Sequence, residues 1–109
     1  MIKRKILSFK ARKEIISVVL FGSVSVHQEK PESDIDIAVI VESANTKAAI
    51  ERLFEEIGIK VSKEFGNIIS PYINTRAEFK AKHKQGLAVI KNIIKANNLL
   101  YGERLENLL

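Results

Sequence analysis

Two short apolar runs in the first half of the chain each predict a β-strand. The first, residues 15–21, is rich in β-branched residues and is followed directly by Gly22. Apolar residues at every position are typical of a central strand that is buried on both faces. In the second run, residues 34–41, acids alternate with isoleucines at the start. Because side chains alternate across a strand, Asp34 and Asp36 share one face and the isoleucines point to the other.

Helical spacing of apolar residues predicts helices around these strands. Residues 2–14 combine apolar positions at helical intervals with many lysines and arginines, which indicates a short amphipathic helix with a basic outer face. The polar stretch 24–33 is expected to form a short helix or turn followed by a loop. A further helix is predicted from about Thr46, with Gly58 as its left-handed cap. We expect residues 59–61 to be a short extended piece.

The last part of the chain predicts a third strand and a long helix. The strand covers residues 68–74, and Pro71 within it places it at an edge of the sheet, because proline cannot donate a ladder hydrogen bond. Thr75 and Glu78 form a capping-box pattern that opens the helix. This helix is expected to end near Tyr101, which would pack against the sheet or a partner chain. The stripe expected to face or border the core contains Phe79, His83, Leu87, Ile90 and Ile94.

These elements predict an α/β fold in which a small mixed sheet of three or four strands is flanked by helices. The length of 109 residues fits a single domain, residues 1–109. Hydrophobic residues make up 46% and charged residues 28%, as in globular rather than disordered proteins. A domain this small has little stability to spare, so an oligomer or a partner chain is compatible with it.

Charge and composition narrow the classes of function. The chain carries a net charge of +5, which favours phosphate-bearing partners. Nucleic acid is not favoured as the partner, since no stacking aromatics are interleaved with the basic residues 2–14. The absence of cysteine excludes disulfides and thiolate zinc sites. No apolar run has the length of a membrane span, so we expect no membrane association and a cytoplasmic location.

The chemistry-bearing residues gather where the two predicted strands meet. Asp34 and Asp36 lie about 6.5–7 Å apart along one face of a strand, which lets both reach one or two hard cations. Two such ions can clamp the attacking and leaving oxygens of a phosphoryl transfer. Gly22 permits close approach of a ligand to the backbone, and a helix starting at Ser23 would point amides at phosphate oxygens. The residues therefore indicate a metal and a phosphate, without choosing nucleotidyl transfer over other phosphoryl chemistry.

Gly22-Ser23, ten further residues and then Asp34-x-Asp36 resembles the signature of the DNA polymerase beta-like nucleotidyltransferase superfamily, especially its minimal single-domain members. The resemblance covers essentially the whole chain and implies the nucleotidyltransferase fold. It implies that Gly22, Ser23 and Ser33 bind the nucleotide, and that Asp34 and Asp36 are the catalytic acids and coordinate Mg²⁺ or Mn²⁺. The implied reaction is transfer of a nucleoside monophosphate to a hydroxyl group, with release of pyrophosphate.

The resemblance also indicates a substrate and a partner. AMP from ATP is the implied transferred group, and minimal members often act as the antitoxin of a helical HEPN-type toxin. Two other classes of function remain open. One is a nucleotide- or partner-binding module with weak or no catalysis, and the other is a nucleic-acid-binding domain that uses the basic residues 2–14.

The sequence departs from the family pattern near the expected site. Val24 stands where many relatives carry arginine, and His27 where many carry glycine. Residues 68–74 contain no acid, although active members often place a third carboxylate on this strand as the base for the acceptor hydroxyl. The nearest acid upstream is Glu64. The alternating residues that share one face of this strand are Ser70, Tyr72 and Asn74.

Overall fold

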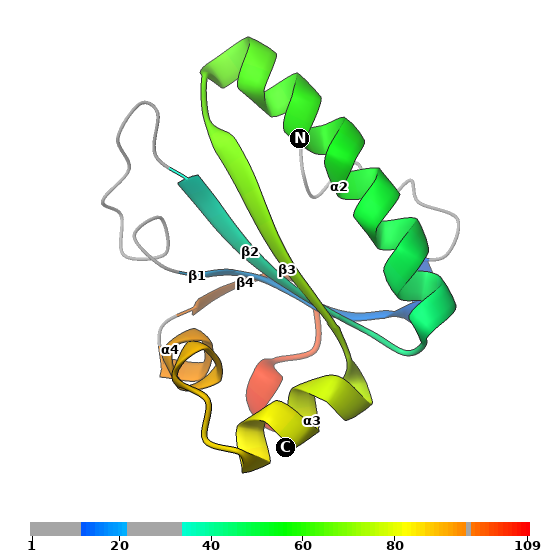
Figure 1. Cartoon of the computed structure of the whole chain (residues 1–109), viewed down its shortest axis with the longest axis vertical. Coiled ribbons are helices and arrows are strands. Elements are labelled where there is room, and N and C mark those ends of the chain that lie inside the picture. The colour runs from blue at the N-terminus through cyan, green and yellow to red at the C-terminus, as the bar shows by residue number, and fades with distance from the viewer. Residues whose placement is uncertain (1–11, 22–33, 96) are drawn as a thin grey trace.

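A mixed four-stranded sheet organises the chain in the computed structural model, which describes residues 12–21, 34–95 and 97–109 (Figure 1). Its strands have the order β3-β2-β1-β4. The central pair, β1 and β2, is antiparallel, β3 runs parallel to β2, and β4 runs antiparallel to β1. The α/β class, the central place of β1 and the edge position of the third strand are thus confirmed. The strands are β1 (Ile15–Phe21), β2 (Asp34–Val41), β3 (Ile68–Thr75) and β4 (Asn97–Gly102).

Helices cover both faces of the sheet, and each face has its own apolar core (Figure 1). On one face α2 packs over Ile37 and Val39, which are fully buried. On the other face α3 and α4 pack over Ala38 and Ile40. Alternate side chains of β2 therefore contribute to the two cores in turn, as expected of a central strand. The remaining elements are η1 (Arg12–Glu14), α2 (Ala44–Phe65), α3 (Arg76–Lys84), α4 (Ala88–Lys95) and η3 (Leu105–Leu108).

The helix α2 is longer than the sequence pattern predicted. It does not end at Gly58 but continues to Phe65, and Gly66 caps it with a φ of 75°. The backbone N–H of Gly66 donates to the Ser62 carbonyl oxygen at 3.0 Å. The apolar stripe explains the continuation, because Val61 is buried in the same core as the residues before Gly58. The predictions of a cap at Gly58 and of an extended piece at residues 59–61 were therefore wrong.

The predicted long C-terminal helix is divided into two helices and a strand. The capping box at its start is confirmed: the Thr75 side chain accepts from the Glu78 N–H, and the Glu78 carboxylate accepts from the Thr75 N–H. However, α3 ends at Lys84, and Gly86 adopts a φ of 70°, which favours glycine and redirects the chain. His83 is exposed rather than at the edge of the core.

The fourth strand replaces the expected end of that helix. Residues 97–102 form β4 and pair with β1, with Val18 opposite Tyr101. The prediction that Tyr101 packs against the sheet is confirmed in a different element, since its partly buried ring contacts the α2-side core from within β4. The stretch 24–33 lies outside the described residues. So does the predicted helix 2–14, apart from the short turn η1 at the end of that segment.

Candidate functional site

The two candidate metal-binding acids belong to the first residues of the central strand β2. Asp34 opens the strand and Asp36 follows two residues later, so the two positions fall on the same face. Ile35 and Ile37 pack into the α2-side core. Asp36 is partly exposed on the opposite face, the one on which α3 and α4 pack. The strand thus directs apolar side chains to one face and keeps a carboxylate at the solvent boundary of the other.

Residues of the two neighbouring strands lie in register beside Asp36. Phe21, the last residue of β1, is its antiparallel partner, and Ser70 is its parallel partner on β3. Phe21 in turn pairs with Asn97 of β4. Gly22 follows Phe21 directly in the sequence, so the last described residue before the Gly-Ser pair is in register with Asp36. Gly22, Ser23 and Ser33, the predicted nucleotide-binding residues, themselves lie outside the described residues.

The strand β3 provides no carboxylate on the Asp36 face. Ser70 is the residue in register with Asp36, and Tyr72 and Asn74 follow on the same side. Glu64 does not fill the gap, because it is an exposed residue of α2, which packs on the opposite face of the sheet. Within the ranges 12–21, 34–95 and 97–109, no three His, Cys, Asp or Glu side chains lie close enough to share a metal ion.

A pair of carboxylates nevertheless fits a nucleotide-bound metal. Mg²⁺ in nucleotide sites is commonly held by one or two carboxylates together with phosphate oxygens and water. Aspartates, a residue type with hard oxygen donors, occupy the alternate positions 34 and 36 of β2, where β3 pairs with both positions and β1 pairs with Asp36. The donor set therefore suits Mg²⁺ or Mn²⁺ carried by a triphosphate.

A polar cluster that the sequence patterns did not reveal lies farther along the same face. The Nζ atom of Lys82 lies 2.6 Å from Asn74 Oδ1 and 3.2 Å from the Tyr72 hydroxyl. It is also 4.9 Å from the centroid of the Tyr72 ring. A signal was present in the sequence, because Lys82 follows the buried Phe79 by three residues and so extends from the core-facing side of α3.

The start of α3 is held by its capping box and two ion pairs. Lys47 of α2 lies 3.3 Å from the Glu78 carboxylate, and Arg76 lies 3.4 Å from Glu42. The hydrogen bond from the Thr75 N–H, assisted by Lys47, lowers the pKa of Glu78 below its ordinary value. These contacts fix the first turn of the helix that carries Lys82.

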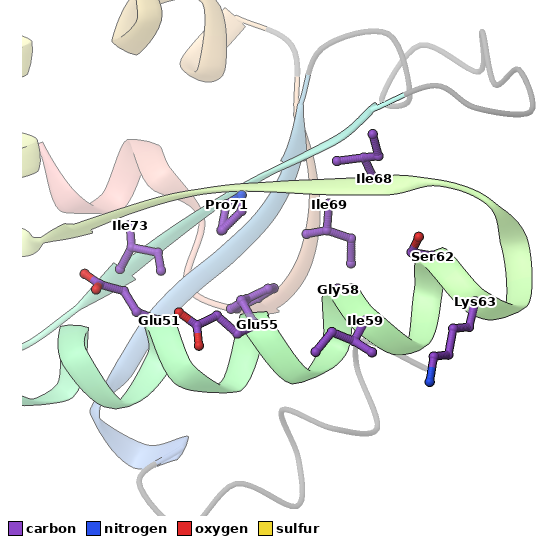
Figure 2. Close-up of a pocket in the computed structure, with 11 residues that line it drawn as sticks. Glu51, Glu55, Gly58, Ile59, Ser62, Lys63, Ile68, Ile69, Pro71 and Ile73 are labelled. Atoms are coloured by element: carbon purple, nitrogen blue, oxygen red, sulfur yellow. The ribbon is translucent and has the colours of Figure 1, made fainter.

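An apolar cleft of about 980 Å³ lies between α2 and β3, on the face opposite Asp36 (Figure 2). Ile69 and Ile73 line it from the strand, and Ile59 lines it from the helix. Glu51 and Glu55 lie along its helical side. Since Asp36 points to the other face, this cleft is separate from the candidate nucleotide site.

The fold and the acids define a class of protein. Residues 4–105 match the family described as Polymerase beta, Nucleotidyltransferase, and the chain belongs to that family. Comparison with curated proteins gave no match. Among the helices of the described residues, none has the length and apolar character needed to cross a membrane.

Several solved structures share the fold. A spectinomycin adenyltransferase, AAD(9) from Enterococcus faecialis, crystallised with ATP and spectinomycin, has a TM-score of 0.68 at 21% identity. The match covers 97% of this chain and 56% of that enzyme, so the present chain spans little more than half its length. A chain of a toxin–antitoxin complex crystallised with AMP-PNP has a TM-score of 0.55 at 16% identity, over 98% of this chain and 78% of that one. A chain of the toxin–antitoxin complex MntA-HpeT has a TM-score of 0.53 at 16% identity, over 97% and 73%.

Proposed function

We propose that this chain transfers a nucleoside monophosphate, AMP from ATP, to a hydroxyl acceptor. The observation that carries the proposal is the pair of acids at the start of β2, beside the end of β1, which Gly22 and Ser23 follow in the sequence. Membership of the nucleotidyltransferase family supports it. The fold that the chain shares with an adenyltransferase crystallised with ATP supports AMP as the transferred group.

Each predicted residue has a role in this reaction. Asp34 and Asp36 would hold Mg²⁺ or Mn²⁺ together with the triphosphate, and Gly22, Ser23 and Ser33 would contact the phosphates. Charge stabilisation of the phosphate oxygens is the chemistry that such a metal would supply when bound. The acceptor oxygen forms a bond to the α-phosphorus, the bond from that phosphorus to the bridging oxygen breaks, and pyrophosphate leaves.

The acceptor proton passes to solvent, because β3 provides Ser70 rather than a carboxylate beside Asp36. General-base assistance is typically worth about 10²–10⁴-fold in rate. We therefore expect ATP to bind normally and to be transferred slowly by the chain alone. A partner protein that brings a carboxylate to the Asp36 face would raise this rate.

A helical toxin of the HEPN type is the partner that we propose. The support is the fold shared with chains of toxin–antitoxin complexes, one of them crystallised with AMP-PNP. In this arrangement the chain is the antitoxin, and a hydroxyl group of the toxin accepts the nucleotide. Co-expression with the product of an adjacent gene, followed by size-exclusion chromatography, tests the association.

The missing carboxylate on β3 favours one alternative, a module that binds a nucleotide without transferring it. Pyrophosphate release from Mg²⁺-ATP separates the two functions. The proposal predicts slow release by the parent chain and none above background by Asp34→Asn or Asp36→Asn. Glu55→Gln is the matched control, since it removes an exposed carboxylate on the opposite face and should leave release unchanged. ATP binding without any pyrophosphate release, alone or with the partner, would establish the binding module instead.

A further inference from the structure

The ammonium group of Lys82 is held on the Asp36 face of the sheet by two neutral oxygen atoms. Its partners are Asn74 Oδ1 at 2.6 Å and the Tyr72 hydroxyl at 3.2 Å, both from β3. The Lys82 side chain is half-buried against the Tyr72 ring. A lysine that merely lay exposed on a surface helix would not be held in this way, because fixing its flexible side chain costs conformational entropy.

The cluster has hydrogen-bond donors in excess and no carboxylate. The nearby acids are paired elsewhere, Glu78 with Lys47 and Glu42 with Arg76. No acid of the described ranges forms an ion pair with Lys82. An ammonium has three N–H donors, and the two contacts on β3 use two of them. The Tyr72 hydroxyl accepts from Lys82, which leaves its own hydrogen free to donate.

Asn74 adds a second indication of unmet hydrogen bonding. Its side chain is fully buried, and its Nδ2 atom has no hydrogen-bond partner in the part of the chain that the structure describes. Withdrawing a charge from water without a counter-ion is unfavourable, and so is burying an unpaired amide. An anionic group placed against Lys82 would supply the counter-charge.

The cluster lies on the same face of the sheet as Asp36, farther along β3. Tyr72 follows Ser70, the parallel partner of Asp36, by two residues on the same face of β3. Phe21 of β1, which Gly22 follows in the sequence, pairs with Asp36 on the side away from β3. If Gly22 and Ser23 bind the triphosphate as proposed above, the cluster lies on the other side of Asp36.

We propose that Tyr72, Asn74 and Lys82 form a subsite for an anionic group, a phosphate or a carboxylate, on the acceptor. The role in acceptor binding rests on the proposed nucleotidyl transfer, whereas the anion site itself does not. Lys82 is then a specificity-determining residue, which pairs with the acceptor's negative charge while the Tyr72 hydroxyl donates to the same group. Asn74 positions the Lys82 ammonium group through the hydrogen bond that its Oδ1 atom accepts.

The anion site is tested without nucleotide or metal. Inorganic phosphate and, in a separate arm, acetate are titrated into the whole chain in EDTA at constant ionic strength. The NMR signals of the Asn74 side-chain amide and the Tyr72 ring report binding at the cluster. Saturable shifts with phosphate indicate a phosphate group on the acceptor, and stronger binding of acetate indicates a carboxylate. Neither anion moving these signals would overturn the proposal.

Variants of one helix provide the controls. Lys82→Met should weaken anion binding roughly ten- to hundredfold, the value expected for a lost charge-assisted hydrogen bond. Lys82→Arg should retain most of it. Lys84→Met, which removes an exposed lysine of the same helix, should bind as the parent does. Equal affinity of the parent and Lys82→Met would refute the site. Because nucleotide is absent, failure of the proposed transferase activity would leave this titration unaffected.

Discussion

Three glycines of this fold differ in a way that predicts three different responses to alanine. Gly58 lies inside α2, and a Cβ atom built there meets nothing within 4 Å. Gly66 caps α2 at a φ of +75° and is equally uncrowded. Gly102 has a φ of +82°, and a Cβ atom there would overlap the carbonyl oxygen of Ile16. The series therefore separates helix propensity, left-handed backbone strain and steric overlap.

The magnitudes follow from these environments. Gly58→Ala should stabilise the protein by roughly 0.5–1 kcal/mol, because glycine is unfavourable inside a helix. Gly66→Ala should destabilise it by about 1–2 kcal/mol, the strain of a left-handed non-glycine residue. Gly102→Ala adds an overlap with backbone that cannot rotate away, which typically costs about 1–3 kcal/mol more. The overlap also disturbs the hydrogen bond from the Glu103 N–H to Ile16 O, 2.8 Å long.

Urea unfolding monitored by circular dichroism measures all three effects. The predicted order of stability is Gly58→Ala, parent, Gly66→Ala and then Gly102→Ala, with unchanged m-values. A loss of stability in Gly58→Ala as large as that in Gly66→Ala would refute the continuation of α2 through Gly58. If Gly102→Ala unfolded at the same urea concentration as Gly66→Ala, the close approach of β4 to β1 would be wrong.

Two further predictions concern Glu78, at the start of α3, and Gly22, a proposed phosphate-binding residue. The lowered pKa of Glu78 means that its carboxylate stabilises the fold above the ordinary carboxylate pKa, and that this contribution is lost as the pH falls through the folded-state pKa. Glu78→Gln should therefore lower the free energy of unfolding at neutral pH, measured by urea unfolding, by no more than about 1 kcal/mol, since the side chain is 41% exposed. A difference from the parent that persisted at pH 2 would contradict this cause. Gly22→Val should clearly weaken ATP binding, measured by calorimetry, and lower the melting temperature only slightly, because a side chain at this position would obstruct the phosphates. A large fall in melting temperature with unchanged ATP affinity would show that Gly22 has a structural role instead.

The central strands could be predicted from the sequence because each has a continuous local signal. Residues 15–21 are apolar throughout, and residues 34–41 alternate before becoming apolar, so burial on both faces determines both segments. Gly58 misled the prediction because composition alone does not show which glycine takes a positive φ. That choice depended on Val61, whose burial against the sheet extends α2 to Gly66.

Beyond the confirmed capping box at Thr75 and Glu78, the last part of the chain could not be predicted from its helical spacing, because tertiary contacts override that spacing. Residues 97–102 form a strand only because the edge of β1 offers backbone partners. At the site, the shared face of Asp34 and Asp36 could be predicted because residues two positions apart on a strand point the same way. The contact between Lys82 and Asn74 joins a helix to a strand, and it depends on the capping box that sets the direction of α3.

Following the two ends of ATP in parallel distinguishes nucleotidyl transfer from transfer of the terminal phosphate. The chain, Mg²⁺ and the protein encoded by the adjacent gene are incubated with ATP labelled at the α-phosphate or, separately, at the γ-phosphate. If the chain transfers AMP, the α-label becomes covalently attached to the acceptor and the γ-label leaves as pyrophosphate. Asp36→Asn should stop both the attachment and the release. Transfer of the γ-label to the acceptor, or α-labelling that persists when both Asp34 and Asp36 are replaced by Asn, would contradict the proposed reaction.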